Sequence, residues 1–141
     1  MHDILMQRMK DEVTRYGVQE LRSPDDVDAV LQTPGTVLVF VNSNCGCAGG
    51  VARPALRVAM QNKRLPDKIT TVFASGDREA TARAREYFVD QPPSSPSFAL
   101  LRGGKLVTMI PRSDIEISSP EKVAEALVRA FDEYCGPTPE N

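Results

Sequence analysis

The chain has 141 residues, 41% hydrophobic and 26% charged, and this length fits one domain with its own core spanning residues 1–141. Its 17 basic and 19 acidic residues give a formal net charge of −2, so no electrostatic feature favours nucleic acid or an anionic membrane as partner. No segment approaches the ~18 consecutive apolar residues of a membrane span, and the N-terminus lacks the apolar core of a secretory signal, so a cytoplasmic location is expected.

The N-terminal third alternates helical and strand-like segments. Residues 1–16 carry apolar side chains at helical spacing, and residues 18–21 form a short strand-like run. Ser23 is a favourable N-cap for a helix over residues 24–31, which begins with proline and two acidic residues. Residues 36–41, TVLVFV, are continuously β-branched or apolar, which predicts a central strand buried on both faces.

A third helix is expected directly after this strand, over residues 47–62. Its apolar positions return at helical spacing, and Val58 is among those expected to face the core. Pro54 lies inside the segment, where it should kink the helix or begin a new turn, because proline lacks the amide hydrogen that a helix interior requires.

The middle of the chain repeats the alternation. Residues 68–75, KITTVFAS, predict a second buried strand, and a helix should follow over residues 78–88. Asp77 is the expected N-cap of that helix. Residues 91–96 form a proline-rich loop.

The C-terminal third predicts a hairpin and a final helix. Two strand-like runs, residues 97–102 and 105–110, are separated only by two glycines, which accept the positive φ of a two-residue turn. The last helix should run over residues 119–135. Parallel βαβ units followed by a hairpin and a helix predict an α/β fold with a mixed central sheet and helices on both faces.

The chemistry is expected in the motif Cys45-Gly46-Cys47, at the junction of the first central strand and the following helix. The first turn of a helix has unpaired N–H groups and partial positive charge, which stabilise a thiolate and lower its pKa. Cys45, at the strand end, should be the attacking sulfur, and Cys47 the resolving sulfur. Gly46 permits the sharp turn that a bridge between them needs, and the small ring favours a relatively oxidising couple.

Ser95-Pro96, just before the strand at residues 97–102, is the second element of the expected site. Thioredoxin-like proteins place a cis-proline at this point, facing the cysteine pair, although an ordinary loop proline is the alternative reading. Such a proline leaves backbone free to pair with an extended substrate. Gly46, Ser95 and Pro96 are therefore the expected substrate-binding positions.

The stretch VNSNCGCAGGVARPAL, residues 41–56, closely resembles the bacilliredoxin family of small thioredoxin-fold proteins with a CGC site. The resemblance continues through residues 20–24, 76–82, 92–97 and 131–135. It implies removal of bacillithiol from S-bacillithiolated client proteins, with bacillithiol as co-substrate and no bound cofactor or metal. It also implies that Cys45 takes up the thiol, which Cys47 or a second bacillithiol then releases.

Alternative readings stay open for several residues. Some relatives are described as disulfide isomerases, so the same chemistry on another client is possible. Cys135 could be a third redox cysteine or a packed apolar residue. The three cysteines could instead hold a soft metal, although they form an incomplete zinc set. Arg53 could supply charge to a thiolate or be a solvated surface residue.

Overall fold

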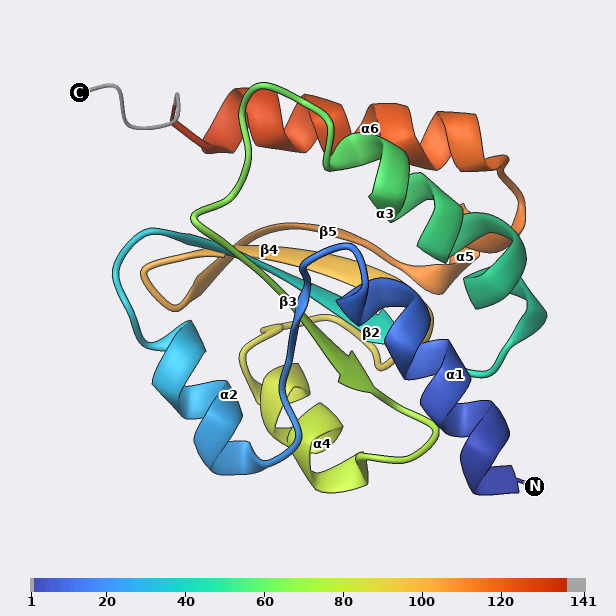
Figure 1. The fold of residues 1–141 in the computed structure, drawn as a ribbon. Coiled ribbons are helices and arrows are strands. Elements are labelled where there is room, and N and C mark those ends of the chain that lie inside the picture. The colour runs from blue at the N-terminus through green and yellow to red at the C-terminus, as the bar shows by residue number, and fades with distance from the viewer. Residues whose placement is uncertain (1, 137–141) are drawn as a thin grey trace.

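The computed structural model describes residues 2–136 and contains a five-stranded sheet with helices around it (Figure 1). In chain order the elements are α1 (His2–Thr14), β1 (Gln19–Glu20), α2 (Pro24–Leu31), β2 (Thr36–Asn42), the π-helix η1 (Ala48–Ala52), α3 (Arg53–Ala59), β3 (Lys68–Phe73), α4 (Arg78–Glu86), β4 (Ser97–Arg102), β5 (Lys105–Ile110), α5 (Arg112–Glu116) and α6 (Pro120–Tyr134).

The strands are ordered β1-β3-β2-β4-β5 across the sheet. β3 runs parallel to β1 and β2, whereas β4 is antiparallel to both β2 and β5. The hairpin between β4 and β5 turns at Gly103 and Gly104, whose φ angles of 57° and 82° require glycine. The predicted mixed sheet is confirmed, and β2 lies at its centre.

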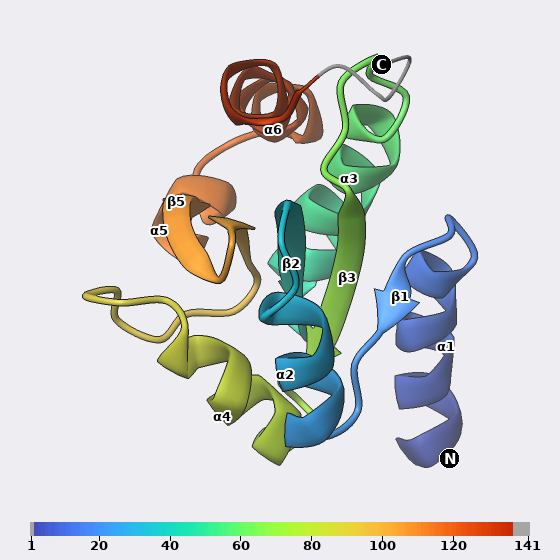
Figure 2. The ribbon, with the colours of Figure 1, turned by 90° about the vertical axis from the view of Figure 1, so that its left-hand side faces the viewer.

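Helices cover both faces of the sheet, and successive residues of β2 supply the two cores. Leu38 and Phe40 pack under α3 and α6, and the Phe40 ring stacks on Phe98 with centroids 4.7 Å apart. Val39 and Val41 belong to the core on the opposite face. The helices α2 and α4 cover that face (Figures 1 and 2). All seven residues of β2 are buried, which confirms a strand buried on both faces.

The two expected helix caps and the expected burial of Val58 have different outcomes in the structure. Ser23 caps α2 as predicted, because its Oγ accepts a hydrogen bond from Asp26 N at 3.1 Å. Asp77 occupies the N-cap position of α4 as predicted, but its side chain makes no capping hydrogen bond; its carboxylate pairs with Lys10 instead. Val58, expected in the core, is 55% exposed. The π-helical turn of η1 adds a residue before α3. The side chains of α3 are therefore rotated about the helix axis, relative to a regular α-helix with 3.6 residues per turn.

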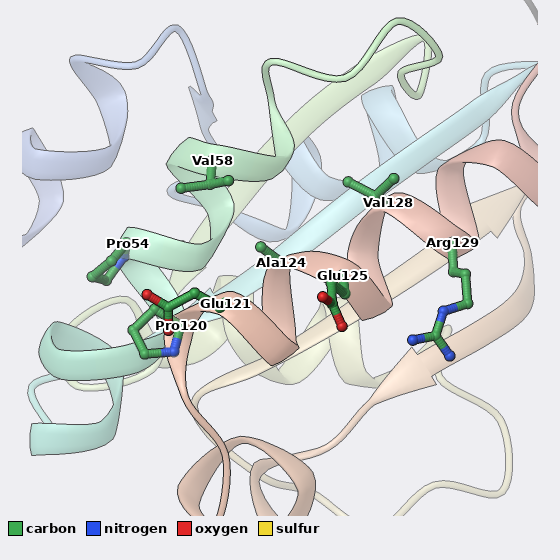
Figure 3. A pocket seen from close by; sticks show the side chains of 8 residues that line it. All are labelled: Pro54, Val58, Pro120, Glu121, Ala124, Glu125, Val128 and Arg129. Carbon is green, nitrogen blue, oxygen red and sulfur yellow. The ribbon is translucent and has the colours of Figure 1, made fainter.

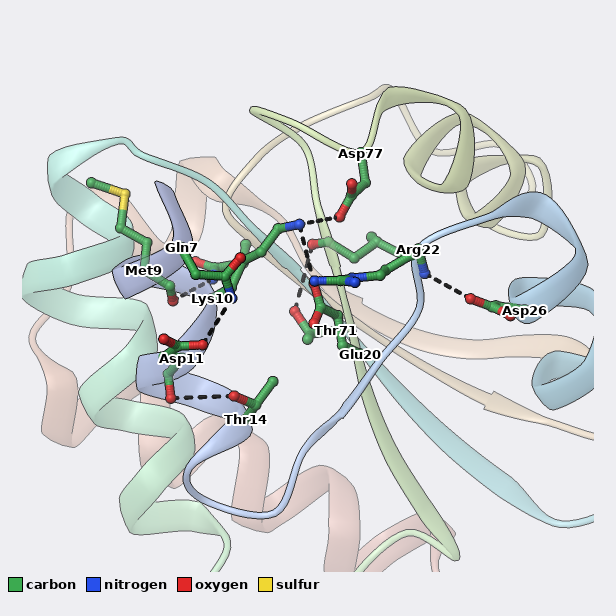
Figure 4. A network of polar contacts seen from close by, with 12 residues as sticks. Gln7, Met9, Lys10, Asp11, Thr14, Glu20, Arg22, Asp26, Thr71 and Asp77 are labelled. Atoms are coloured by element: carbon green, nitrogen blue, oxygen red, sulfur yellow. Dashed lines mark hydrogen bonds and ion pairs between the residues drawn. The ribbon is translucent and has the colours of Figure 1, made fainter. Parts of the chain in front are cut away.

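A cluster of charged side chains attaches α1 to the sheet (Figure 4). Lys10 Nζ lies 3.1 Å from Glu20 of β1 and 2.8 Å from Asp77, and all three side chains are at most 20% exposed. Arg22 also pairs with Glu20, at 3.2 Å. Burial alone would lower the pKa of Lys10, but the hydrogen bonds that Lys10 donates to Asp77 and Glu20, together with their negative charges, outweigh burial and raise it.

Within residues 2–136, no helix has the combination of length and apolar character that a bilayer span requires.

Candidate active site

Three strand ends meet at one edge of the sheet. In the β2–β4 ladder Val41 pairs with Ser97, and in the β4–β5 ladder Phe98 pairs with Ile110. The end of β2, the start of β4 and the end of β5 therefore lie together. The segments just beyond them hold the cysteine pair, the Ser95–Pro96 bond and α5.

A hydrogen-bonded loop places Cys45 beyond the end of β2. Asn42 Oδ1 accepts from the backbone N–H of Ser43 at 2.9 Å, and Ser43 Oγ accepts from that of Cys45 at 3.3 Å. On the other side, the backbone N–H of Asn44 donates to Ser75 Oγ at 3.0 Å, which ties the loop to the segment after β3. The turn is thus fixed by short polar side chains.

Arg53 lies beneath this loop. Its side chain is only 7% exposed, and Nη1 donates to Asn42 Oδ1 at 2.9 Å and to the Ser43 carbonyl at 3.0 Å. Its Nε donates to Glu12 of α1 at 3.0 Å. The interpretation of Arg53 as a solvated surface residue is wrong, because tertiary partners from α1 and β2 surround the guanidinium.

The two thiols of the motif are half-buried and free, and their environments differ. The backbone N–H of Cys47 is the largest of the influences that lower the pKa of Cys45, followed by the Cys47 thiol, Arg112 and the N–H of Ala48. Burial raises the pKa of Cys47, and the neighbouring Cys45 sulfur raises it further. The geometry thus favours a thiolate on Cys45 and a protonated thiol on Cys47.

The loop before β4 is fixed around Ser94. The Ser95–Pro96 peptide bond is cis, as expected. The Ser94 carbonyl accepts from Ser97 Oγ at 3.0 Å and from Arg85 Nη2 at 3.3 Å. Ser95 is half-buried and Pro96 is buried, so Ser95 is the more accessible of the two expected substrate contacts.

The helix α5 was not predicted from the sequence, and it contributes two charged side chains that act on the cysteine pair. Arg112 and Glu116 form an ion pair at 3.0 Å, four residues apart along this short helix. Arg112 acts electrostatically on both cysteines, and Glu116 on Cys47. Pro111, followed by an oppositely charged pair at i and i+4, was the available signal for a helical turn here.

Cys135 lies at the opposite end of β2. It is 2% exposed, and its thiol packs beside the side chain of Thr36, the first residue of that strand. Seven residues of strand separate the two ends, which is about 20 Å at the usual rise per residue. Burial raises the pKa of Cys135. In this fold Cys135 cannot exchange directly with Cys45, and a redox role for it stays a prediction.

The three cysteines therefore do not gather into one ligand set. Among the residues that the structure describes, no three His, Cys, Asp or Glu side chains are arranged to hold a metal ion. The metal-binding alternative required Cys135 beside the cysteine pair, so the described geometry does not support it.

A surface groove of about 680 Å³ lies between α3 and α6 (Figure 3). Its lining residues are Pro54, Val58, Pro120, Glu121, Ala124, Glu125, Val128 and Arg129. None is a cysteine or belongs to the loop before β4. The groove is therefore separate from the candidate site.

A dithiol at a strand–helix junction, beside a cis-proline loop, on this sheet defines a thioredoxin-like protein with thiol–disulfide chemistry. Solved structures agree on the fold. A thioredoxin variant from Halobacterium salinarum has a TM-score of 0.59 at 16% identity, covering 86% of this chain and 93% of its own. Thioredoxin from Malassezia sympodialis has a TM-score of 0.54 at 18% identity, covering 79% and 89%.

The chain belongs to the disulphide isomerase family, which matches residues 1–135, and its relatives there are named bacilliredoxins. A bacilliredoxin of Geobacillus kaustophilus is 53% identical, covering 96% of this chain and 93% of the relative. One from Halalkalibacterium halodurans is 50% identical, covering 96% and 92%. The protein is thus a thiol–disulfide oxidoreductase that acts on thiol-containing substrates.

Proposed function

We propose that the protein removes bacillithiol from S-bacillithiolated proteins, with Cys45 as the attacking sulfur and Cys47 as the resolving sulfur. The observation that carries the order of attack is the asymmetry of the two thiols. Backbone N–H groups at the helix start lower the pKa of Cys45, whereas burial raises that of Cys47. The bacilliredoxin names of the relatives support bacillithiol as the transferred thiol.

In the first step, the Cys45 thiolate attacks the bacillithiol sulfur of the client's mixed disulfide. A new sulfur–sulfur bond forms between Cys45 and bacillithiol, and the client sulfur leaves as a thiolate and is protonated. The client is thereby reduced, and the disulfide now resides on Cys45. Gly46, around which an added Cβ would meet no atom within 4 Å, and half-buried Ser95 leave room for the client.

In the second step, Cys47 loses its proton and attacks the Cys45 sulfur. The Cys45–Cys47 bond forms and bacillithiol leaves as a thiolate. Alternatively, a second bacillithiol attacks the thiol held on Cys45 and leaves as the bacillithiol disulfide. Two further low-molecular-weight thiols would return the CGC pair to the dithiol. Such a cycle needs a reducing compartment, which is why we place the protein in the cytoplasm.

The test is a trap in the Cys47→Ala variant. After incubation with a bacillithiolated protein, mass spectrometry should find one bacillithiol on Cys45 and a freed client thiol. The matched Cys45→Ala variant should carry none. A parallel client modified with glutathione separates selectivity for bacillithiol from general mixed-disulfide exchange. If both clients remain modified, the proposal is wrong.

The match to the disulphide isomerase family favours a second activity, the reshuffling of protein disulfides. In that reaction the Cys45 thiolate would attack a client disulfide and a client thiolate would later displace it, with no net redox change. Recovery of activity from scrambled ribonuclease measures it. Isomerisation should survive Cys47→Ala if client thiols perform the release.

A further inference from the structure

We infer that Arg112 is a positioning residue that sets the charge of the attacking sulfur, and that Glu116 moderates its effect. This inference rests on the proposed function in one respect, the choice of Cys45 as the attacking sulfur.

The backbone places Arg112 at the site independently of any electrostatic argument. Arg112 comes two residues after Ile110, which pairs with Phe98 at the sheet edge where β2 ends. α5 contacts η1, the helical turn that begins directly after Cys47. Ile115 is fully buried in the core on that face, against which Cys47 also packs, and so anchors the short helix there.

Two contacts to the loop before β4 and one within α5 fix Arg112. Its backbone N–H donates to Ser94 Oγ at 3.3 Å, and its Nη1 donates to the Ser95 carbonyl at 3.4 Å. Its Nε donates to Glu116 Oε1 at 3.0 Å. Within residues 2–136, Nη2 has no hydrogen-bond partner, so the guanidinium keeps donors for another group. Its side chain is 43% exposed, so a reacting disulfide can approach it.

Arg112 and Glu116 of α5 both act on the cysteine pair. Cys47 and Arg112 are the ionisable groups with the largest effects on the pKa of Cys45, and Glu116 adds its charge at Cys47. Arg112 lowers the pKa of Cys45, after the larger effect of the Cys47 backbone N–H. At Cys47 the two charges act in opposite senses, because Arg112 lowers the pKa and Glu116 raises it. The two charges of one ion pair therefore have opposite effects on thiolate formation.

Because the two charges act in opposite directions, removing each should shift the reactivity of Cys45 in opposite directions. A purely structural role of α5 would not produce opposite shifts. The reduced full-length protein is treated with iodoacetamide between pH 5 and 10, and the rate at Cys45 is read by peptide mass spectrometry. At pH 7, Arg112→Gln should slow alkylation of Cys45 about threefold and move the profile to higher pH. Glu116→Gln should speed alkylation and move the profile to lower pH. Arg129→Gln, on exposed α6 surface, is the matched control and should change neither.

The inference is overturned if Arg112→Gln leaves the Cys45 profile unchanged, or if both variants shift it in the same direction, as loosening of α5 would. High salt provides a second measurement, because screening should bring the Cys45 alkylation profiles of the two variants closer together. Alkylation needs no client, so the outcomes are separable. Opposite shifts together with a failed bacillithiol trap refute only the proposed function, and a working trap with unchanged profiles refutes only the role of Arg112.

Discussion

The guanidinium of Arg53 donates a hydrogen bond to the carbonyl of Ser43 at 3.0 Å, two residues before the candidate nucleophile. A side chain of α3, the helix after the cysteines, thus holds the end of β2, the strand before them. The same Nη1 reaches Asn42 Oδ1, and Nε pairs with Glu12 of α1. One buried side chain therefore joins α1, β2 and α3 beneath the CGC loop.

Removing this guanidinium should destabilise the protein. Arg53→Met leaves the Ser43 carbonyl without its guanidinium donor and Asn42 Oδ1 with only the Ser43 N–H, and we expect a loss of about 3 kcal/mol in the free energy of unfolding. Urea denaturation measures it. Arg57→Met, one turn further along α3 and exposed, is the control and should cost less than about 0.5 kcal/mol. Equal losses would show that Arg53 has no special role.

The glycines of η1 offer a matched pair for the same contact. A Cβ added at Gly49 would lie 2.8 Å from Arg53 Nη2, whereas one added at Gly50 would meet nothing within 4 Å. Gly49→Ala should therefore cost about 1 kcal/mol of stability. Gly50→Ala should be neutral or stabilising, because alanine favours helix more than glycine does. Thermal denaturation compares them, and in an Arg53→Met background the difference should shrink.

Local sequence patterns predicted the strands, the hairpin and the dithiol, but they did not predict the contacts of Arg53. The run TVLVFV, the Gly103-Gly104 turn and the CGC spacing are local patterns, and the strands, the hairpin and the position of the dithiol followed from them. The burial of Arg53 depends on Glu12 and Asn42, which are distant in the sequence, so no local pattern could predict it. The exposure of Val58 follows from a π-helical turn, which hydrophobic periodicity does not represent.

The Lys10 cluster should contribute to stability rather than to activity. Lys10→Met leaves Glu20 and Asp77 side by side and partly buried without their shared cation, and we expect a loss of about 2 kcal/mol. Lys63→Met, at an exposed position, is the control. Chemical denaturation gives the stability, and the rate of thiol transfer should change little in the molecules that remain folded. A loss no larger than that of the control would contradict this account.

Cys135 should be dispensable for thiol transfer. Because it lies at the far end of β2, Cys135→Ala should leave the rate of client reduction unchanged. Cys135→Ser should lower stability by about 1–2 kcal/mol, because it buries a hydroxyl where a thiol packed. Disulfide mapping of the oxidised wild-type protein should find only the Cys45–Cys47 bridge. A bridge to Cys135, or a slower alanine variant, would establish a third redox cysteine.

The order of the two sulfurs is tested most directly by the pH profile of each in the reduced wild-type protein. Because the folded protein lowers the pKa of Cys45 and raises that of Cys47, the Cys45 thiolate persists to lower pH than the Cys47 thiolate. Site-resolved alkylation between pH 5 and 10 should modify Cys45 first throughout the neutral range, with its rate falling as the pH drops through its pKa. Faster modification of Cys47, or a Cys45 as unreactive as buried Cys135, would contradict the account.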